Sequence, residues 1–124
     1  MDSPLAFVIE DDKNLSFAYA EAIEEAGFKT EIFQDGREGL NNLKTATPAM
    51  IILDLNLPNV HGLEILKFIR SDERLRKSRV IITTADDRTA ETLHGKADIV
   101  LVKPVGYGQL RDLAARLIRH AREN

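Results

Sequence analysis

Short runs of apolar residues are spaced along the chain and separated by more polar stretches. They hold three to five residues each, are rich in Val and Ile, and lie at residues 5–9, 49–53, 80–82 and 99–102. Runs of this kind are typical of strands buried on both faces, as in a parallel sheet covered by helices. A fifth segment, residues 28–33, is more polar and predicts a strand nearer the edge of the sheet.

Amphipathic stretches lie between these runs and predict helices. Apolar residues recur at helical spacing from Leu15 to Ala26, and Gly27 stands where a glycine commonly ends a helix. A second strong pattern extends from Leu110 to Ile118, with arginines on the opposite side. Weaker helices are expected at residues 37–44, 62–70 and 88–93.

The strand–helix pair therefore occurs five times, which indicates an α/β fold. Short connections and right-handed crossovers predict a doubly wound, five-stranded parallel sheet flanked by helices on both faces. Because 124 residues suit one compact domain and no linker interrupts the pattern, we expect a single domain over residues 1–124.

Composition narrows the possible functions. The net charge of −3 argues against direct binding to nucleic acid as the main function. The chain has no cysteine, which excludes disulfides, thiolate metal sites and cysteine nucleophiles. The sequence shows neither a signal-peptide pattern nor an apolar run long enough to cross a bilayer, so we expect a cytoplasmic protein with no membrane partner.

The residues suited to binding or catalysis lie directly after the apolar runs. In a doubly wound sheet, ligands bind beyond the carboxyl ends of the strands. The residues at these positions combine acids, hydroxyls and one lysine: Glu10, Asp11, Asp12, Asp54, Thr83, Thr84 and Lys103. Crowded carboxylates repel one another, and one takes up a proton unless a cation neutralises them. A hard divalent ion, Mg²⁺ or Mn²⁺, resolves that conflict.

Each acid taken singly has a plainer interpretation, because carboxylates often cap helices or close turns. Asp12 fits that interpretation best, as the N-cap of the first helix. The set as a whole, placed at three strand ends together with Lys103, favours a functional site.

The chain resembles the CheY-like receiver domain of two-component response regulators along nearly its whole length. Four motifs carry the resemblance, one at each of four strand ends: residues 8–12 (VIEDD), 52–64 (ILDLNLPNVHGLE), 83–85 (TTA) and 102–104 (VKP). The resemblance implies a flavodoxin-like fold, Mg²⁺ as cofactor, and a sensor histidine kinase or a histidine phosphotransfer protein as phosphodonor.

The resemblance also implies a role for each matching residue. Asp54 is the phosphoacceptor and a metal ligand, Asp11 binds the metal directly, and Glu10 binds it through water. The main-chain carbonyl of Asn56 completes the metal shell, and Lys103 pairs with the phosphoryl oxygens.

Further roles concern the surroundings of the phosphoryl group. Thr84, rather than Thr83, matches the hydroxyl residue that follows the phosphoryl group on activation. Asn56 and Asp86 match positions that tune how long the phosphoryl group survives. Three more residues shape the backbone at the site. Pro58 kinks the loop after Asp54, and Gly62 either is a loop residue or permits close packing at the start of the third helix. Pro104 either simply ends a strand or, as the resemblance implies, aims Lys103 through a fixed peptide bond that can be cis.

Two departures from the family pattern fall on the fourth helix, the fifth strand and the fifth helix. In the family this face commonly carries output, and it is called the output face below. Val100 stands where the family carries Tyr or Phe, so the usual aromatic relay cannot operate. Thr84 and Lys103 are closer together than the family norm by about three residues, nearly one helical turn. The fourth helix is therefore expected to be short, shifted or irregular, with Gly95 ending it. Tyr107 offers either a partner contact or ordinary packing.

The sequence thus predicts a phosphorylation-dependent switch of a protein-interaction surface, with an atypical output face and no conventional enzymatic turnover. The downstream target stays open. A receiver-like interaction module that is never phosphorylated is the main alternative; the altered output face favours it, and the intact acidic set opposes it. An aspartyl-phosphate phosphatase needs a general acid where Asn56 stands.

Overall fold

The computed structural model describes residues 3–93 and 95–123. Five parallel strands form one sheet in the order β2-β1-β3-β4-β5, which confirms the doubly wound α/β prediction and the edge position of β2. The winding direction changes between β1 and β3, so the loops that follow these two strands diverge to opposite faces. The strands are β1 (Leu5–Ile9), β2 (Lys29–Phe33), β3 (Met50–Asp54), β4 (Arg79–Thr84) and β5 (Ile99–Val102).

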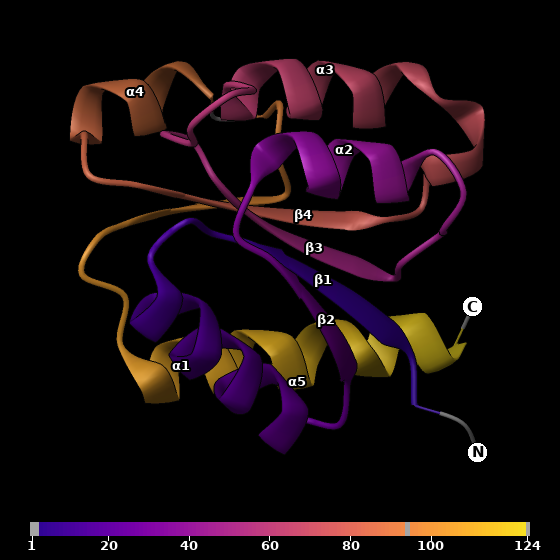
Figure 1. Cartoon of the computed structure of the whole chain (residues 1–124). Coiled ribbons are helices and arrows are strands. Elements are labelled where there is room, and N and C mark those ends of the chain that lie inside the picture. The colour runs from indigo at the N-terminus through magenta and orange to yellow at the C-terminus, as the bar shows by residue number, and fades with distance from the viewer. Residues whose placement is uncertain (1–2, 94, 124) are drawn as a thin grey trace.

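Helices cover both faces of the sheet (Figure 1). Helices α1 and α5 lie on one face, and α2, α3 and α4 lie on the other. All five helices are within a few residues of the predicted segments: α1 (Lys13–Glu25), α2 (Gly36–Leu43), α3 (Gly62–Ser71), α4 (Asp87–Thr92) and α5 (Tyr107–Glu123). A short 3-10 helix, Glu73–Leu75, follows α3.

The core consists of two layers, one on each side of the sheet. Successive residues of a strand face opposite sides. In β1, Phe7 and Ile9 therefore pack toward α2 and α3, whereas Ala6 and Val8 pack toward α1 and α5. Because both faces are buried, β1 contains no polar residue, and this is why a continuous apolar run was a reliable signal.

Helix α1 has the ends that its sequence predicts. The Asp12 carboxylate accepts a hydrogen bond from the Leu15 N–H at 3.0 Å, which confirms Asp12 as the N-cap. Gly27 follows the helix with a φ of 115°, a conformation that glycine adopts without strain.

Helix α4 is short, as the spacing between Thr84 and Lys103 predicts. It has six residues, none of them buried, and Gly95 lies beyond its end with a φ of 91°. Within the described ranges, no helix has both the length and the apolar character that crossing a membrane requires.

Candidate functional site

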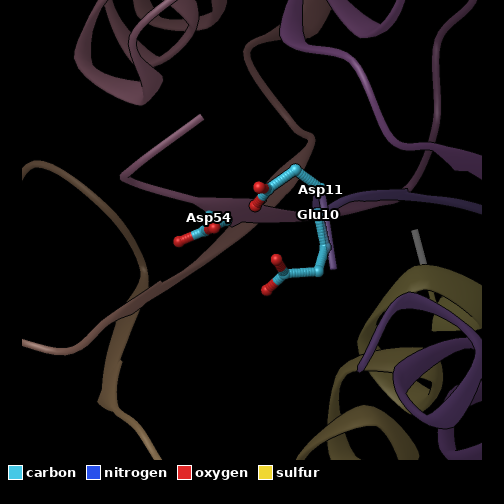
Figure 2. Close-up of side chains that lie close together, drawn as sticks. All are labelled: Glu10, Asp11 and Asp54. Atoms are coloured by element: carbon cyan, nitrogen blue, oxygen red, sulfur yellow. The ribbon is translucent and has the colours of Figure 1, made fainter. Parts of the chain in front are cut away.

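Three carboxylates meet at the carboxyl edge of the sheet. Glu10 and Asp11 follow β1, and Asp54 ends β3, its neighbour in the sheet. Each residue can offer one oxygen such that these atoms all lie within 4.8 Å of one another. Figure 2 shows the three carboxylates gathered around a common space. Glu10 is 1% and Asp54 3% exposed, whereas Asp11 is exposed.

Lys103, which follows the edge strand β5, also reaches this cluster. Its backbone N–H continues the pairing of β5 with β4 by donating to the Thr84 carbonyl at 2.7 Å. Its Nζ donates to Glu10 Oε1 at 2.9 Å and lies 3.5 Å from Asp54 Oδ1. The Lys103–Pro104 bond is cis, in agreement with the resemblance. The geometry thus confirms that the predicted acids and the lysine converge.

Burial dominates the electrostatics of the acids. Burial raises the pKa of Glu10 to about 7, although the hydrogen bonds from Lys103 and Asp12 oppose the rise. The pKa of Asp54 is also raised by burial, with the Lys103 charge opposing. For Lys103, burial lowers the pKa, but the hydrogen bond to Glu10 and the charges of both acids outweigh it and raise the pKa. One lysine therefore offsets only part of the cost of holding these carboxylates together.

The donor set fits a hard divalent cation. Mg²⁺ and Mn²⁺ prefer carboxylate and carbonyl oxygens, and three carboxylates converge here. The Asn56 N–H donates to Asp54 Oδ1 at 3.3 Å, which fixes the start of the following loop beside the acid. The Asn56 side chain is exposed, and the metal-binding role of its carbonyl stays a prediction.

Gly62 lets helix α3 begin against the backbone of Asp54 and Leu55. A Cβ atom at Gly62 would lie 2.6 Å from the Asp54 carbonyl oxygen and 2.7 Å from Leu55 Cα. The predicted close packing is therefore confirmed. In the loop between Asp54 and Gly62, the Val60 N–H donates to the Pro58 carbonyl at 2.8 Å, and Asn59 has a φ of 69°. The loop therefore turns sharply after Pro58.

Thr84 ends β4, and Asp86 lies in the turn that leads into α4. Thr84 is 1% exposed, and its hydroxyl accepts a hydrogen bond from the Asp86 N–H at 3.2 Å. The Asp86 carboxylate caps α4 by accepting from the Arg88 N–H at 3.0 Å and the Thr89 hydroxyl at 2.9 Å. Its contacts are those of a helix cap, and its effect on phosphoryl lifetime stays a prediction.

Val100, in β5, is half-buried. It packs against the core layer that α2 and α3 cover. The Tyr107 hydroxyl donates to Glu25 Oε2 at 2.6 Å, and this bond raises the pKa of Tyr107 to about 12. Arg111 also pairs with Glu25, at 3.6 Å. Tyr107 therefore links α5 to α1 by a surface hydrogen bond while it remains 40% exposed, and the choice between a partner contact and packing stays a prediction.

Tyr19 was not predicted as a site residue, because the helical pattern marks it only as an apolar position of α1. Its hydroxyl is buried, and the charges of Lys103, Glu10 and Asp54 act on its pKa. The sequence does contain one signal for it: a tyrosine, with its hydroxyl, stands at a helical position that faces the sheet.

The chain matches known proteins over nearly all of its length. The response regulator receiver domain family matches residues 6–115. Response regulator ArlR of Staphylococcus saprophyticus is 34% identical over 113 residues, which cover 89% of this chain and 49% of ArlR. The probable methanogenesis regulatory protein FilR2 of Methanothrix harundinacea is 30% identical over 121 residues, covering 89% of this chain and 78% of FilR2.

Solved structures agree with these matches. The signal receiver domain of a putative LuxO repressor protein from Vibrio parahaemolyticus superposes with a TM-score of 0.86 at 27% identity, covering 98% of this chain and 94% of that one. The chain spans about half the length of ArlR. Fold, motif order and sequence identity lead to one conclusion: the chain belongs to the response regulator receiver domain family of two-component signalling.

Proposed function

We propose that the chain accepts a phosphoryl group on Asp54 in the presence of Mg²⁺ or Mn²⁺ and thereby changes a protein-interaction surface. The observation that carries the proposal is the convergence of Lys103 with Glu10 and Asp54 beside the three-carboxylate cluster. The acids surround the space where a cation is needed, and the ammonium lies 2.9 Å from Glu10 and 3.5 Å from Asp54.

The acceptor oxygen needs positioning more than activation. A carboxylate attacks phosphorus without a base, and in-line phosphoryl transfer depends mainly on placement and charge neutralisation. As a bond forms between an Asp54 oxygen and phosphorus, the bond from phosphorus to the donor nitrogen breaks, and its electron pair stays on the donor imidazole. The Asn56 N–H, which donates to Asp54 Oδ1 at 3.3 Å, helps to orient the acceptor carboxylate.

Glu10, Asp11, Asp54 and the Asn56 carbonyl would hold the cation. When bound, it supplies positive charge opposite the phosphoryl oxygens. Lys103 supplies the second positive charge by moving its ammonium from Glu10 toward the phosphoryl group. The Thr84 hydroxyl accepts a hydrogen bond from the Asp86 N–H, and its own O–H can donate to the phosphoryl oxygens.

The proposed donor is a sensor histidine kinase or a histidine phosphotransfer protein, and the proposed setting is the cytoplasm. Each round modifies the chain itself, so the protein acts as a switch rather than as an enzyme with conventional turnover. We place the output on α4, β5 and α5, where Val100 and the six-residue α4 distinguish this chain. Those features are also the observation that favours the second candidate, an interaction module that is never phosphorylated.

One experiment separates the two candidates. Wild-type protein incubated with acetyl phosphate and Mg²⁺ is expected to gain the mass of one phosphoryl group, because Asp54 becomes an acyl phosphate. Asp54→Asn is expected to gain nothing. The matched control is Asp72→Asn, which removes a carboxylate at the C-terminal end of α3 and is expected to behave like wild type. A wild-type protein that gains no mass would favour the interaction module.

A further inference from the structure

Two hydroxyl groups near the site are buried without a hydrogen-bond partner. Within the described part of the chain, the buried side-chain nitrogen or oxygen atoms that lack a partner are Tyr19 Oη and Thr83 Oγ1. Tyr19 is 4% exposed and Thr83 is 0% exposed. Buried hydroxyls are rarely left unpaired in native proteins because desolvation is not compensated, so the pair calls for an explanation.

Both hydroxyls lie on the same face of the sheet as the phosphoacceptor. Thr83 is paired in register with Asp54 across β3 and β4. By strand alternation, these two residues share the face of Ile81 and Ile52, which pack together with Tyr19 in the core covered by α1 and α5. The two orphan hydroxyls therefore line the inner side of the site.

The lysine and the first acid are on that face as well. Glu10 continues the alternation of Val8, and Lys103 continues that of Leu101, and both apolar residues pack in the same core as Tyr19. Burial is the largest cause of the raised pKa of Tyr19, and among charged groups Lys103 acts on it most. Tyr19 is accordingly a neutral phenol at neutral pH, with Lys103 as its leading electrostatic neighbour.

The ammonium of Lys103 has three N–H donors. In this structure it donates to Glu10 and lies 3.5 Å from Asp54. When the ammonium leaves Glu10 for a phosphoryl group, it needs a neutral acceptor on the buried side. We propose that Tyr19 is a positioning residue whose hydroxyl accepts a hydrogen bond from Lys103 Nζ, directly or through one water that Thr83 also binds. This inference rests on the proposed phosphorylation of Asp54.

Tyr19→Phe tests the role by removing one oxygen and leaving the ring in the core. The expected result is phosphorylation by acetyl phosphate about tenfold slower than in wild type, the cost of one hydrogen bond to a charged group. Tyr107→Phe is the matched control, because the Tyr107 hydroxyl bonds Glu25 instead. It is expected to react at the wild-type rate.

A spectroscopic measurement on wild-type protein does not depend on how the variant folds. The chain has two tyrosines, so labelling tyrosine with ¹³C at the ζ carbon gives two resonances, and Tyr107→Phe assigns them. Beryllium trifluoride with Mg²⁺ serves as a stable stand-in for the phosphoryl group. Its binding is expected to shift the Tyr19 resonance, because the hydroxyl gains a partner.

The outcomes are distinct. A phosphorylated wild type together with an unslowed Tyr19→Phe, or with a Tyr19 resonance that does not respond, overturns the role of Tyr19 and leaves the proposed function intact. A wild-type protein that takes up no phosphoryl group overturns the proposed function, and this inference with it. If Tyr19→Phe does not fold, the wild-type resonance decides alone.

Discussion

At the scale of single residues, two groups compete for the ammonium of Lys103. In this structure it lies nearer to Glu10, at 2.9 Å, than to Asp54, at 3.5 Å. Glu10 is almost fully buried, so losing the lysine leaves its carboxylate with little solvation. A cation bound by the acids would compensate Glu10 and free the lysine. The contact between Lys103 and Glu10 therefore couples the proposed phosphorylation to cation binding.

Replacing Lys103 by Met is expected to lower the free energy of unfolding of the metal-free protein by about 2 kcal/mol at about pH 8, because Glu10 is then buried without its partner. At about pH 5 the loss is expected to be smaller, since the pKa of Glu10 is already raised and protonation removes its charge. Urea denaturation followed by circular dichroism measures both values.

The control for this variant is Lys67→Met, which removes the same charge from the exposed side of α3. It is expected to change stability little at either pH. Equal losses for the two variants at both pH values would show that the contact with Glu10 contributes nothing.

At the scale of elements, α4 is the segment that most distinguishes this chain. Its six residues include none that is buried, and Leu93, just after it, is its main anchor in the core. Because the helix itself has so little apolar surface in contact with the sheet, α4 depends on its cap at Asp86 and on the turn at Gly95 in addition to Leu93. Both ends of α4 are therefore set by local backbone chemistry.

Replacing glycine by alanine is expected to have opposite effects on stability at two positions, one after α4 and one in α5. Gly95→Ala is expected to destabilise the protein by about 1 kcal/mol, because φ is 91° there even though nothing lies near the added Cβ. Gly108→Ala is expected to stabilise it by up to about 1 kcal/mol, because Gly108 lies in α5 and the nearest atom to its added Cβ is 3.6 Å away. Thermal unfolding of the two variants checks the signs, and two shifts in the same direction would contradict the backbone argument.

The elements were predictable where a residue's surroundings are implied by its neighbours in sequence. Continuous apolar runs located β1, β3, β4 and β5, and the Asp12 cap and Gly27 bounded α1. Strand ends then located the acids and the lysine. Contacts between distant residues left no local signal: the preference of Lys103 for Glu10 and the bond from Tyr107 to Glu25 depend on how helices and strands pack.

At the scale of the whole molecule, the buried acids tie stability to pH. The pKa of Glu10 rises from 4.5 to about 7 on folding, so its contribution to stability is complete below pH 4.5 and is lost as the pH rises through about 7. Asp54 has a raised pKa and acts in the same direction. The metal-free protein is therefore expected to become less stable across this interval.

Mg²⁺ is expected to reverse that loss. It binds the deprotonated acids, so its stabilising effect should be larger at about pH 8 than at about pH 5, reaching about 3 kcal/mol when Mg²⁺ is at roughly a hundred times its dissociation constant. Thermal melts with and without Mg²⁺ at both pH values measure this. Asp11→Asn, which removes one of the three acids, is the control. If it retains the full Mg²⁺ effect, the ion acts by general screening and not at this site.

The bond between Lys103 and Glu10 joins residues 93 positions apart, from opposite ends of the chain. The ammonium can reach the acids only when both segments have folded into the sheet. A chain cut between residues 10 and 103 would leave the carboxylates without this counter-charge. The proposed acceptor site would therefore exist only in a molecule that is intact and folded over this span.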